Sequence, residues 1–225
     1  MLDKLIKTTC GLLALWMPFH AEAIYVGNQT FSMDPESRMV AKFVVNNNKE
    51  PRIYRVAIRA INSPGEDEIN TKPADGELLF APRQLTLQPG SGDFFKFFYQ
   101  GPEDGKERYY RAAFEEIPPQ NRTLNRTEDS AVSLIPVVVM DTILVVRPRD
   151  VNFKWFYNRA QGELSNSGNT WFKLLLKPSC SSTEDESDSW YIRPGDRLRR
   201  NTLKSAAELF IIYNDRFINI YDECS

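Results

Sequence analysis

Histidine is nearly missing from this sequence: His20 is the single one among 225 residues. The charges nearly cancel, with 28 Lys and Arg against 30 Asp and Glu, so no basic field exists to hold nucleic acid. No apolar run reaches the about 20 residues that span a bilayer. The longest, residues 132–146, is interrupted by Pro136 and Asp141. These shortages argue against polyanion binding and against stable membrane insertion.

The first 23 residues have the pattern of a cleaved export signal. A short basic start precedes the apolar residues 10–19, and residues 21–23 (Ala-Glu-Ala) have the small-x-small ending that a signal peptidase recognises. The apolar stretch is about half the length of a membrane span. We therefore expect residues 1–23 to be removed, so that the exported chain starts at Ile24.

Without its leader the chain has no histidine, which excludes Ser-His-Asp and Cys-His catalysis and every His-ligated metal site. Two cysteines remain, Cys180 and Cys224, in a compartment where disulfides persist. We expect them to form a disulfide; the alternative is two free buried thiols. No catalytic residue, metal or other cofactor is predicted.

From Ile24 onward the hydrophobic period is mostly two, which is typical of β-strands. Gly, Pro and Asn interrupt the strand-like runs every 8–12 residues or so, as in an antiparallel sandwich. Residues 204–210 are expected to make a turn or two of helix. The expected strands are residues 39–45, 53–61, 85–87, 94–99, 109–117, 132–146, 152–157, 162–166 and 171–176.

The pattern breaks at residues 147–150 (Arg-Pro-Arg-Asp), directly after the longest apolar strand. A proline at this place suits a hinge, because proline cannot extend a β-ladder. We therefore expect an all-β protein of two immunoglobulin-like sandwiches, at residues 24–147 and 150–225. The second is small enough for its core to be marginal, and both remaining cysteines lie in it.

Residues 132–146 (VSLIPVVVMDTILVV) are apolar on both faces, over far more than the usual strand length of about 5–6 residues. The polar residues 120–130 come just before them. A long apolar strand beside such a loop is typical of an exposed edge, which exists to pair with another chain. The residues alone leave a second interpretation open, a central strand in a large core.

Several segments, taken in order, resemble the PapD-like periplasmic pilus chaperones. Residues 106–119 (KERYYRAAFEEIPP) resemble the strand and Pro-Pro that mark this family, and residues 87–102 resemble its preceding hairpin. Residues 162–176 and 211–217 (IIYNDRF) resemble its Asn-containing strand pair and its late strand with an interdomain aspartate. The resemblance is strongest for the divergent branch of common-pilus and related alternate systems.

This resemblance implies a boomerang-like pair of sandwiches and a non-catalytic function in the periplasm. Such a chaperone lends a strand to an incomplete pilus subunit and delivers the subunit to an outer-membrane usher. The register counted back from Arg147 puts Leu134, Pro136, Val138 and Met140 into the subunit, and the opposite parity offers Ile135, Val137 and Val139.

Charged positions depart from the family pattern. The family anchors the subunit's terminal carboxylate with an Arg and a Lys, but Thr30 and Ile143 stand at those places. Arg147, four residues beyond Ile143, and Arg111 are the candidate anchors; the alternative is that both are plain surface charges.

Glu107 and Asp215 match the acidic residues of the salt bridge that joins the two domains in this family. Its arginine position holds Thr86, so Arg83 is the expected substitute.

Two other classes compete with the chaperone. A secreted adhesion or receptor module would share the two sandwiches, signal and disulfide, but would not need the two-faced apolar strand. The second competing class is an exported enzyme, but no pair of carboxylates that could carry catalysis stands out in this sequence.

Overall fold

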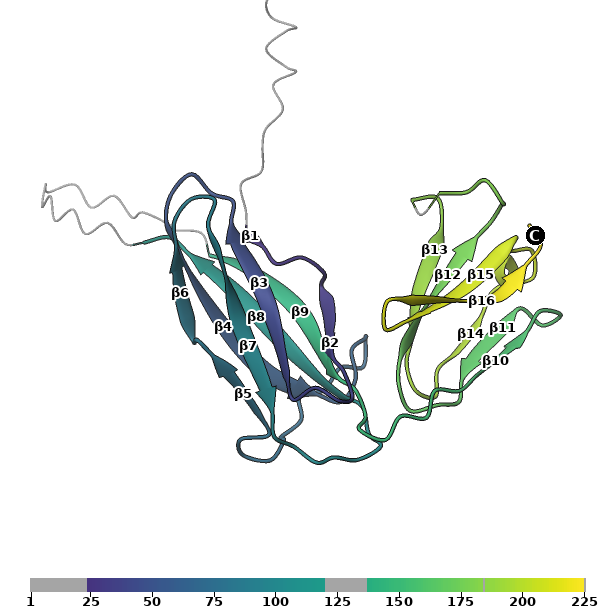
Figure 1. Cartoon of the computed structure of the whole chain (residues 1–225), viewed down its shortest axis with the longest axis horizontal. Helices are drawn as coiled ribbons and strands as arrows, with labels where there is room; N and C mark the ends of the chain where they lie inside the picture. Colours follow the sequence, from purple (N-terminus) through teal and green to yellow (C-terminus); the bar gives the residue numbers. More distant parts are fainter. Residues whose placement is uncertain (1–23, 120–136, 184, 225) are drawn as a thin grey trace, which may run out of the picture.

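The computed structural model describes residues 24–119, 137–183 and 185–224. Within these ranges the chain is all-β, without an α-helix, and forms two sandwich domains (Figure 1). The predicted fold class is therefore confirmed. The predicted export signal and the donor candidates Leu134, Ile135 and Pro136 lie outside the described residues.

The first domain packs a four-stranded sheet, in the order β1-β3-β7-β5, against a five-stranded sheet, in the order β2-β9-β8-β4-β6. Alternate residues point inward: on β7 the side chains of Phe95 and Phe97 are fully buried, while Phe94 and Phe98 are exposed. The strands are β1 (Ile24–Tyr25), β2 (Thr30–Met33), β3 (Met39–Asn46), β4 (Arg52–Ile61), β5 (Leu78–Ala81), β6 (Gln84–Leu87), β7 (Gly92–Tyr99), β8 (Arg108–Ile117) and β9 (Val138–Val146).

The second domain packs a three-stranded sheet, in the order β10-β11-β14, against a four-stranded sheet, in the order β13-β12-β15-β16. Leu164, Phe172, Leu174 and Ile211 fill its core. The strands are β10 (Trp155–Asn158), β11 (Glu163–Asn166), β12 (Phe172–Lys177), β13 (Asp188–Ile192), β14 (Arg197–Arg199), β15 (Glu208–Tyr213) and β16 (Arg216–Asp222).

The helix expected at residues 204–210 does not form. A 3-10 turn covers Asn201–Leu203 instead, and β15 begins at Glu208. Leu209 and Ile211 are both fully buried in the core. Their spacing of two suits a strand, and the packing of this face overrides the helix propensity of the preceding residues.

A small apolar cluster joins the two domains. Ile61, Tyr109 and Val145 lie on the five-stranded sheet of the first domain, and they pack with Ile143 and with Trp171 of the second domain. The second domain therefore covers one end of this sheet's outer face. The other end, where β9 begins, stays away from the domain boundary (Figure 1).

Candidate functional site

Strand β9 has different neighbours along its two halves. On one side β8 pairs with it over its whole length, from Val138 to Val146. On the other side β2 runs parallel to it and reaches only from Ile143 to Val146, with Thr30 beside Ile143. Among the described residues, no strand pairs with this side of β9 from Val138 to Thr142. The edge is open to an added strand over this half.

The open half of β9 exposes apolar side chains. Val138 is 38% exposed and Val139 is 53% exposed, whereas Leu144 in the covered half is fully buried. Since successive side chains alternate between the two faces, Val138 and Met140 lie on the same face as Leu144. Met140 packs against the core of the sandwich. The interpretation as an exposed edge therefore describes the first half of β9, and the interpretation as a buried core strand describes its second half.

The two positions at which the family carries its anchor lie side by side, because Thr30 and Ile143 are register partners in the β2–β9 pair. Arg111 is the partner of Ile143 on β8. Its guanidinium donates to both carboxylate oxygens of Glu68, over 2.7 to 3.1 Å. These hydrogen bonds raise the pKa of Arg111. Arg111 is thus paired within its own domain.

Arg147 follows β9 and reaches into the second domain. Its guanidinium donates to Thr170 Oγ1 at 2.7 Å and to the Trp171 carbonyl at 3.1 Å. It also lies 4.8 Å from the ring centroid of Trp171 and 4.7 Å from that of Tyr213. Its Nε is buried and has no hydrogen-bond partner among the described residues, with Asp34 Oδ1 at 4.0 Å. Burial lowers the pKa of Arg147.

Glu107 binds the same two residues of the second domain. Its carboxylate accepts hydrogen bonds from Thr170 Oγ1 at 3.0 Å and from the Trp171 amide at 2.9 Å, and the hydroxyl of Tyr109 donates to it as well. Burial raises the pKa of Glu107, and these three donors oppose the shift. Thr170 therefore accepts from Arg147 and donates to Glu107 across the domain boundary.

The other two predicted interdomain residues lie apart from each other. Asp215 is in the turn between β15 and β16 and lines the interdomain cleft together with Arg147. Arg83 is exposed between β5 and β6, where its carbonyl accepts from the Val56 amide at 3.3 Å. Arg147 shares Thr170 with Glu107 and lines the same cleft as Asp215, whereas no hydrogen bond or ion pair joins the Arg83 side chain to either acid among the described residues.

The interdomain cleft has a volume of about 640 Å³. Residues 28–32, in and before β2, line it from the first domain, and Lys173 and Tyr191 line it from the second. Sequence reasoning missed Lys173, and it also missed Arg193, whose guanidinium donates to Ser63 Oγ at 2.8 Å across the boundary. Neither residue has a sequence signal of its own, because a cleft between two domains brings together distant segments.

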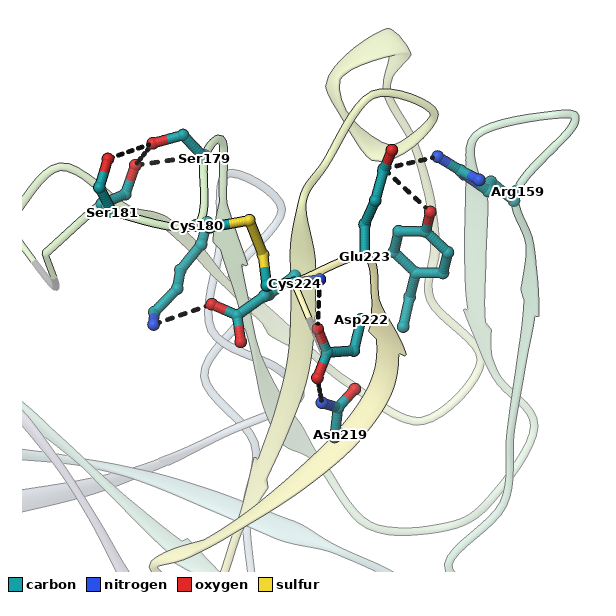
Figure 2. Close-up of a disulfide and its surroundings, with 12 residues drawn as sticks. Arg159, Ser179, Cys180, Ser181, Asn219, Asp222, Glu223 and Cys224 are labelled. Atoms are coloured by element: carbon teal, nitrogen blue, oxygen red, sulfur yellow. Dashed lines mark hydrogen bonds and ion pairs between the residues drawn. A yellow bond between two sulfur atoms is a disulfide. The ribbon is translucent and has the colours of Figure 1, made fainter.

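The predicted disulfide between Cys180 and Cys224 is confirmed (Figure 2). It joins the loop after β12 to the end of β16. Next to it, the carboxylate of Asp222 accepts from the Cys224 amide at 2.7 Å and from the side-chain amide of Asn219 at 3.1 Å. The last strand of the chain is thereby fixed at its C-terminal end.

Similar proteins share this architecture. The crystal structure of the class 5 fimbriae chaperone CfaA superposes with a TM-score of 0.51 at 16% identity, covering 89% of this chain and 99% of that one. This likeness assigns the fold to the two-domain class of fimbrial chaperones. No family model matches the chain. Among the described residues, no helix is long and apolar enough to cross a membrane.

Sequence relatives give the family. The chain is 54% identical to the probable fimbrial chaperone EcpE of Escherichia coli (strain K12), over 99% of this chain and 93% of that protein. It is 28% identical to the probable fimbrial chaperone EcpB of Escherichia coli O139:H28 (strain E24377A / ETEC), over 89% and 92%. The chain belongs to this family, the PapD-like fimbrial chaperones.

Proposed function

We propose that this protein is a periplasmic chaperone that binds pilus subunits by strand addition to β9 and delivers them to an outer-membrane usher. One observation carries the proposal: no described strand pairs with one edge of β9 over its first half, which exposes Val138 and Val139, while the other half is covered. An exposed apolar edge is an aggregation hazard unless a partner strand uses it. The family of fimbrial chaperones supports the same conclusion.

The alternation of side chains along β9 indicates which of them would enter the groove of the pilus subunit. Val138 and Met140 lie on the core side of the sheet, shared with Leu144. A subunit that continues this sheet has its own core on that side, so we assign these two residues to its groove. Leu134 and Pro136 extend the row by parity, outside the described residues. Val139 lies on the opposite face.

The remaining assignments complete the proposal. Residues 1–23 are the export signal, residues 24–147 form the subunit-binding domain and residues 150–225 the second domain. Both candidate anchors already have partners, Arg147 in Thr170 and Trp171 and Arg111 in Glu68. Arg147 is the one that lines the cleft beside β2, so we assign the anchor to it. Arg147 and Glu107 also hold the domains together.

The test is recovery of a pilus subunit co-expressed with the chaperone in the periplasm. A variant with Val138→Glu and Met140→Glu puts two charges into an apolar groove, where an unpaired ion costs several kcal/mol. We expect it to stay folded by circular dichroism and to recover less than a tenth of the subunit. Val139→Glu, on the opposite face of the same strand, is the matched control and is expected to keep most of the recovery.

Full recovery by the folded Val138→Glu, Met140→Glu variant contradicts strand addition through this row. A greater loss with Val139→Glu shifts the register by one residue. A variant that lacks β-sheet signal is replaced by Val138→Ser with Met140→Ser, which removes the apolar groups without adding charge.

A further inference from the structure

The chain changes sheets between β1 and β2. β1 pairs with β3 in the four-stranded sheet, and β2 pairs with β9 in the five-stranded sheet, so residues 26–29 cross from one sheet to the other (Figure 1). Gly27, whose φ of 63° lies in the left-handed region, turns the chain within this crossing. Backbone groups that leave one ladder before joining the next need hydrogen-bond partners from elsewhere.

Lys42 on β3 supplies such a partner from inside the sandwich. Buried and exposed residues alternate along β3, and Lys42, like Val44, is one of the buried ones, with only 7% of it exposed. Its ammonium donates to the Asn28 carbonyl in the crossing and lies 4.7 Å from the ring centroid of Phe31 on β2. The aliphatic stem of Lys42 thus packs in the interior, while a carbonyl and a ring face hold the charge.

Core packing alone does not account for a lysine at this position. Burial lowers the pKa of Lys42 to about 8, because the fold disfavours the charged form of the side chain. An apolar side chain of similar length would fill the same space without this cost. The hydrogen bond to the crossing segment is therefore the contribution that distinguishes Lys42 from an apolar residue.

The crossing ends where β2 joins β9. The Gln29 carbonyl, one residue after the carbonyl that Lys42 holds, accepts from the Ile143 amide at 2.8 Å. Ile143 is the first residue of β9 that pairs with β2, so the open half of β9 ends there. The contact made by Lys42 is thus next to the bond that closes the open edge.

We propose that Lys42 positions the start of β2 and thereby sets the length of the edge that β9 leaves open to a partner strand. Without the hydrogen bond from Lys42, the crossing segment separates from β9 at Ile143 more often and leaves a longer, less ordered edge. This positioning acts in the free chaperone. Its effect on a pilus subunit rests on the proposed function, because a preformed edge loses less conformational freedom on binding.

Hydrogen exchange of the subunit-free chaperone, resolved by residue with NMR, compares the two ends of β2. The Ile143 amide donates to Gln29 at the start, and the Arg147 amide donates to the Met33 carbonyl at 3.1 Å at the other end. Lys42→Met keeps an apolar stem and removes the donor. It is expected to speed exchange at least tenfold at Ile143 and less than twofold at Arg147. Lys42→Arg restores a charged donor and is expected to keep both rates within threefold.

The matched control is Lys96→Met, because Lys96 is exposed on β7, on the outer face of the same sheet. It is expected to leave both exchange rates unchanged. Equal acceleration at Ile143 and Arg147 in Lys42→Met, or no acceleration, overturns the inference, because Lys42 then has no selective effect on the start of β2. If Lys42→Met lacks the spectrum of a folded protein, the shorter and uncharged Lys42→Gln takes its place, with the same expectation for the same two amides.

Recovery of a co-expressed pilus subunit connects the edge to binding. Lys42→Met is expected to recover at least threefold less subunit per chaperone, and Lys42→Arg the same amount within twofold. Faster exchange at Ile143 with full recovery overturns the effect of Lys42 on binding. If the Val138→Glu, Met140→Glu variant also recovers the subunit in full, the proposed function fails, while the exchange rates still decide whether Lys42 positions β2.

Discussion

Strands β9 and β16 each end a domain and, within the described part of the chain, each has an edge without a partner strand, along its first half in β9, but the two edges are built differently. β16 lies at the edge of its sheet, and a register irregularity between Leu209 and Phe210 interrupts its pairing with β15. Its exposed residues include Arg216 and Asp222, and the disulfide at Cys224 fixes its end. Bulges and charges of this kind protect an edge from unwanted pairing.

The open half of β9 has none of these protections apart from Asp141. Val138 and Val139 are exposed there, and the ladder with β8 is regular. The comparison teaches that exposure of an edge is not by itself a sign of function. It indicates function where the usual protections are missing and the exposed side chains are apolar.

The largest expected effect separates the two halves of β9. Leu144→Asp places an unpaired charge in the core and is expected to cost about 4 kcal/mol or more of unfolding free energy, enough to abolish folding. Val138→Asp, in the open half, is expected to shift the melting temperature by a few degrees at most. Thermal melts followed by circular dichroism measure both. Equal losses would mean that the open half is as well packed as the covered half.

The second effect concerns the protection of β16. Replacing Cys180 and Cys224 together by Ser opens a loop of 44 residues. The chain-entropy model gives a loss of roughly 4 kcal/mol for a loop of this length. Trp155, Trp171 and Trp190 all lie in the second domain, so tryptophan fluorescence during denaturant titration reports on that domain. We expect its transition to move to lower denaturant; an unchanged midpoint would contradict a stabilising bridge.

The third effect lies at the end of β9, where Arg147 enters the second domain. Arg147→Ala removes the hydrogen bonds to Thr170 and Trp171, and bonds to a charged group contribute about 1.5–3 kcal/mol. The expected results are a shift in tryptophan emission and a larger radius of gyration in small-angle scattering. Arg147→Lys keeps the charge but not the planar stacking, so its emission shift and radius of gyration should lie between those of the unaltered protein and of Arg147→Ala. An unchanged radius would argue against a connecting role.

The smallest effect is a pH dependence at the domain boundary. Burial raises the folded-state pKa of Glu107 above its ordinary value of 4.5. Between the two pKa values the folded state binds more protons than the unfolded state, so unfolding free energy falls as the pH rises through this interval. Glu107→Gln is expected to flatten this slope in urea titrations, while Glu36→Gln, at an exposed position, should leave it unchanged. A slope that persists without Glu107 assigns it to another group.

Much of the fold was predictable from local pattern. Period-two alternation gave β3, β4, β7 and β8 nearly to their ends, because one face of each strand is buried. Short or polar strands were not predicted: β1 has two residues and β14 has three, too few for a period to appear. The predicted helix at residues 204–210 was wrong, because tertiary packing of Leu209 and Ile211 determined a strand there.

The candidate site was predictable only along one strand. The two-sided apolar pattern of residues 132–146 indicated that β9 is unusual, but not which half is open, since that depends on where β2 begins to pair. Lys173 and Arg193 were missed because their surroundings come from segments far away in sequence. Arg83 was expected at the boundary as the substitute for Thr86, which stands at the family's arginine position, whereas Arg147 is the arginine that bonds to Thr170 and Trp171 there.

The parallel pairing of β2 with β9 limits how far a partner strand could extend along β9. The Gln29 carbonyl accepts from the Ile143 amide at 2.8 Å, so this position on β9 is already occupied within the chaperone. Under the proposed strand addition, a partner strand extending along the open edge would meet β2 at this position and could pair no further. The start of β2 would then set the register of every strand that pairs with β9.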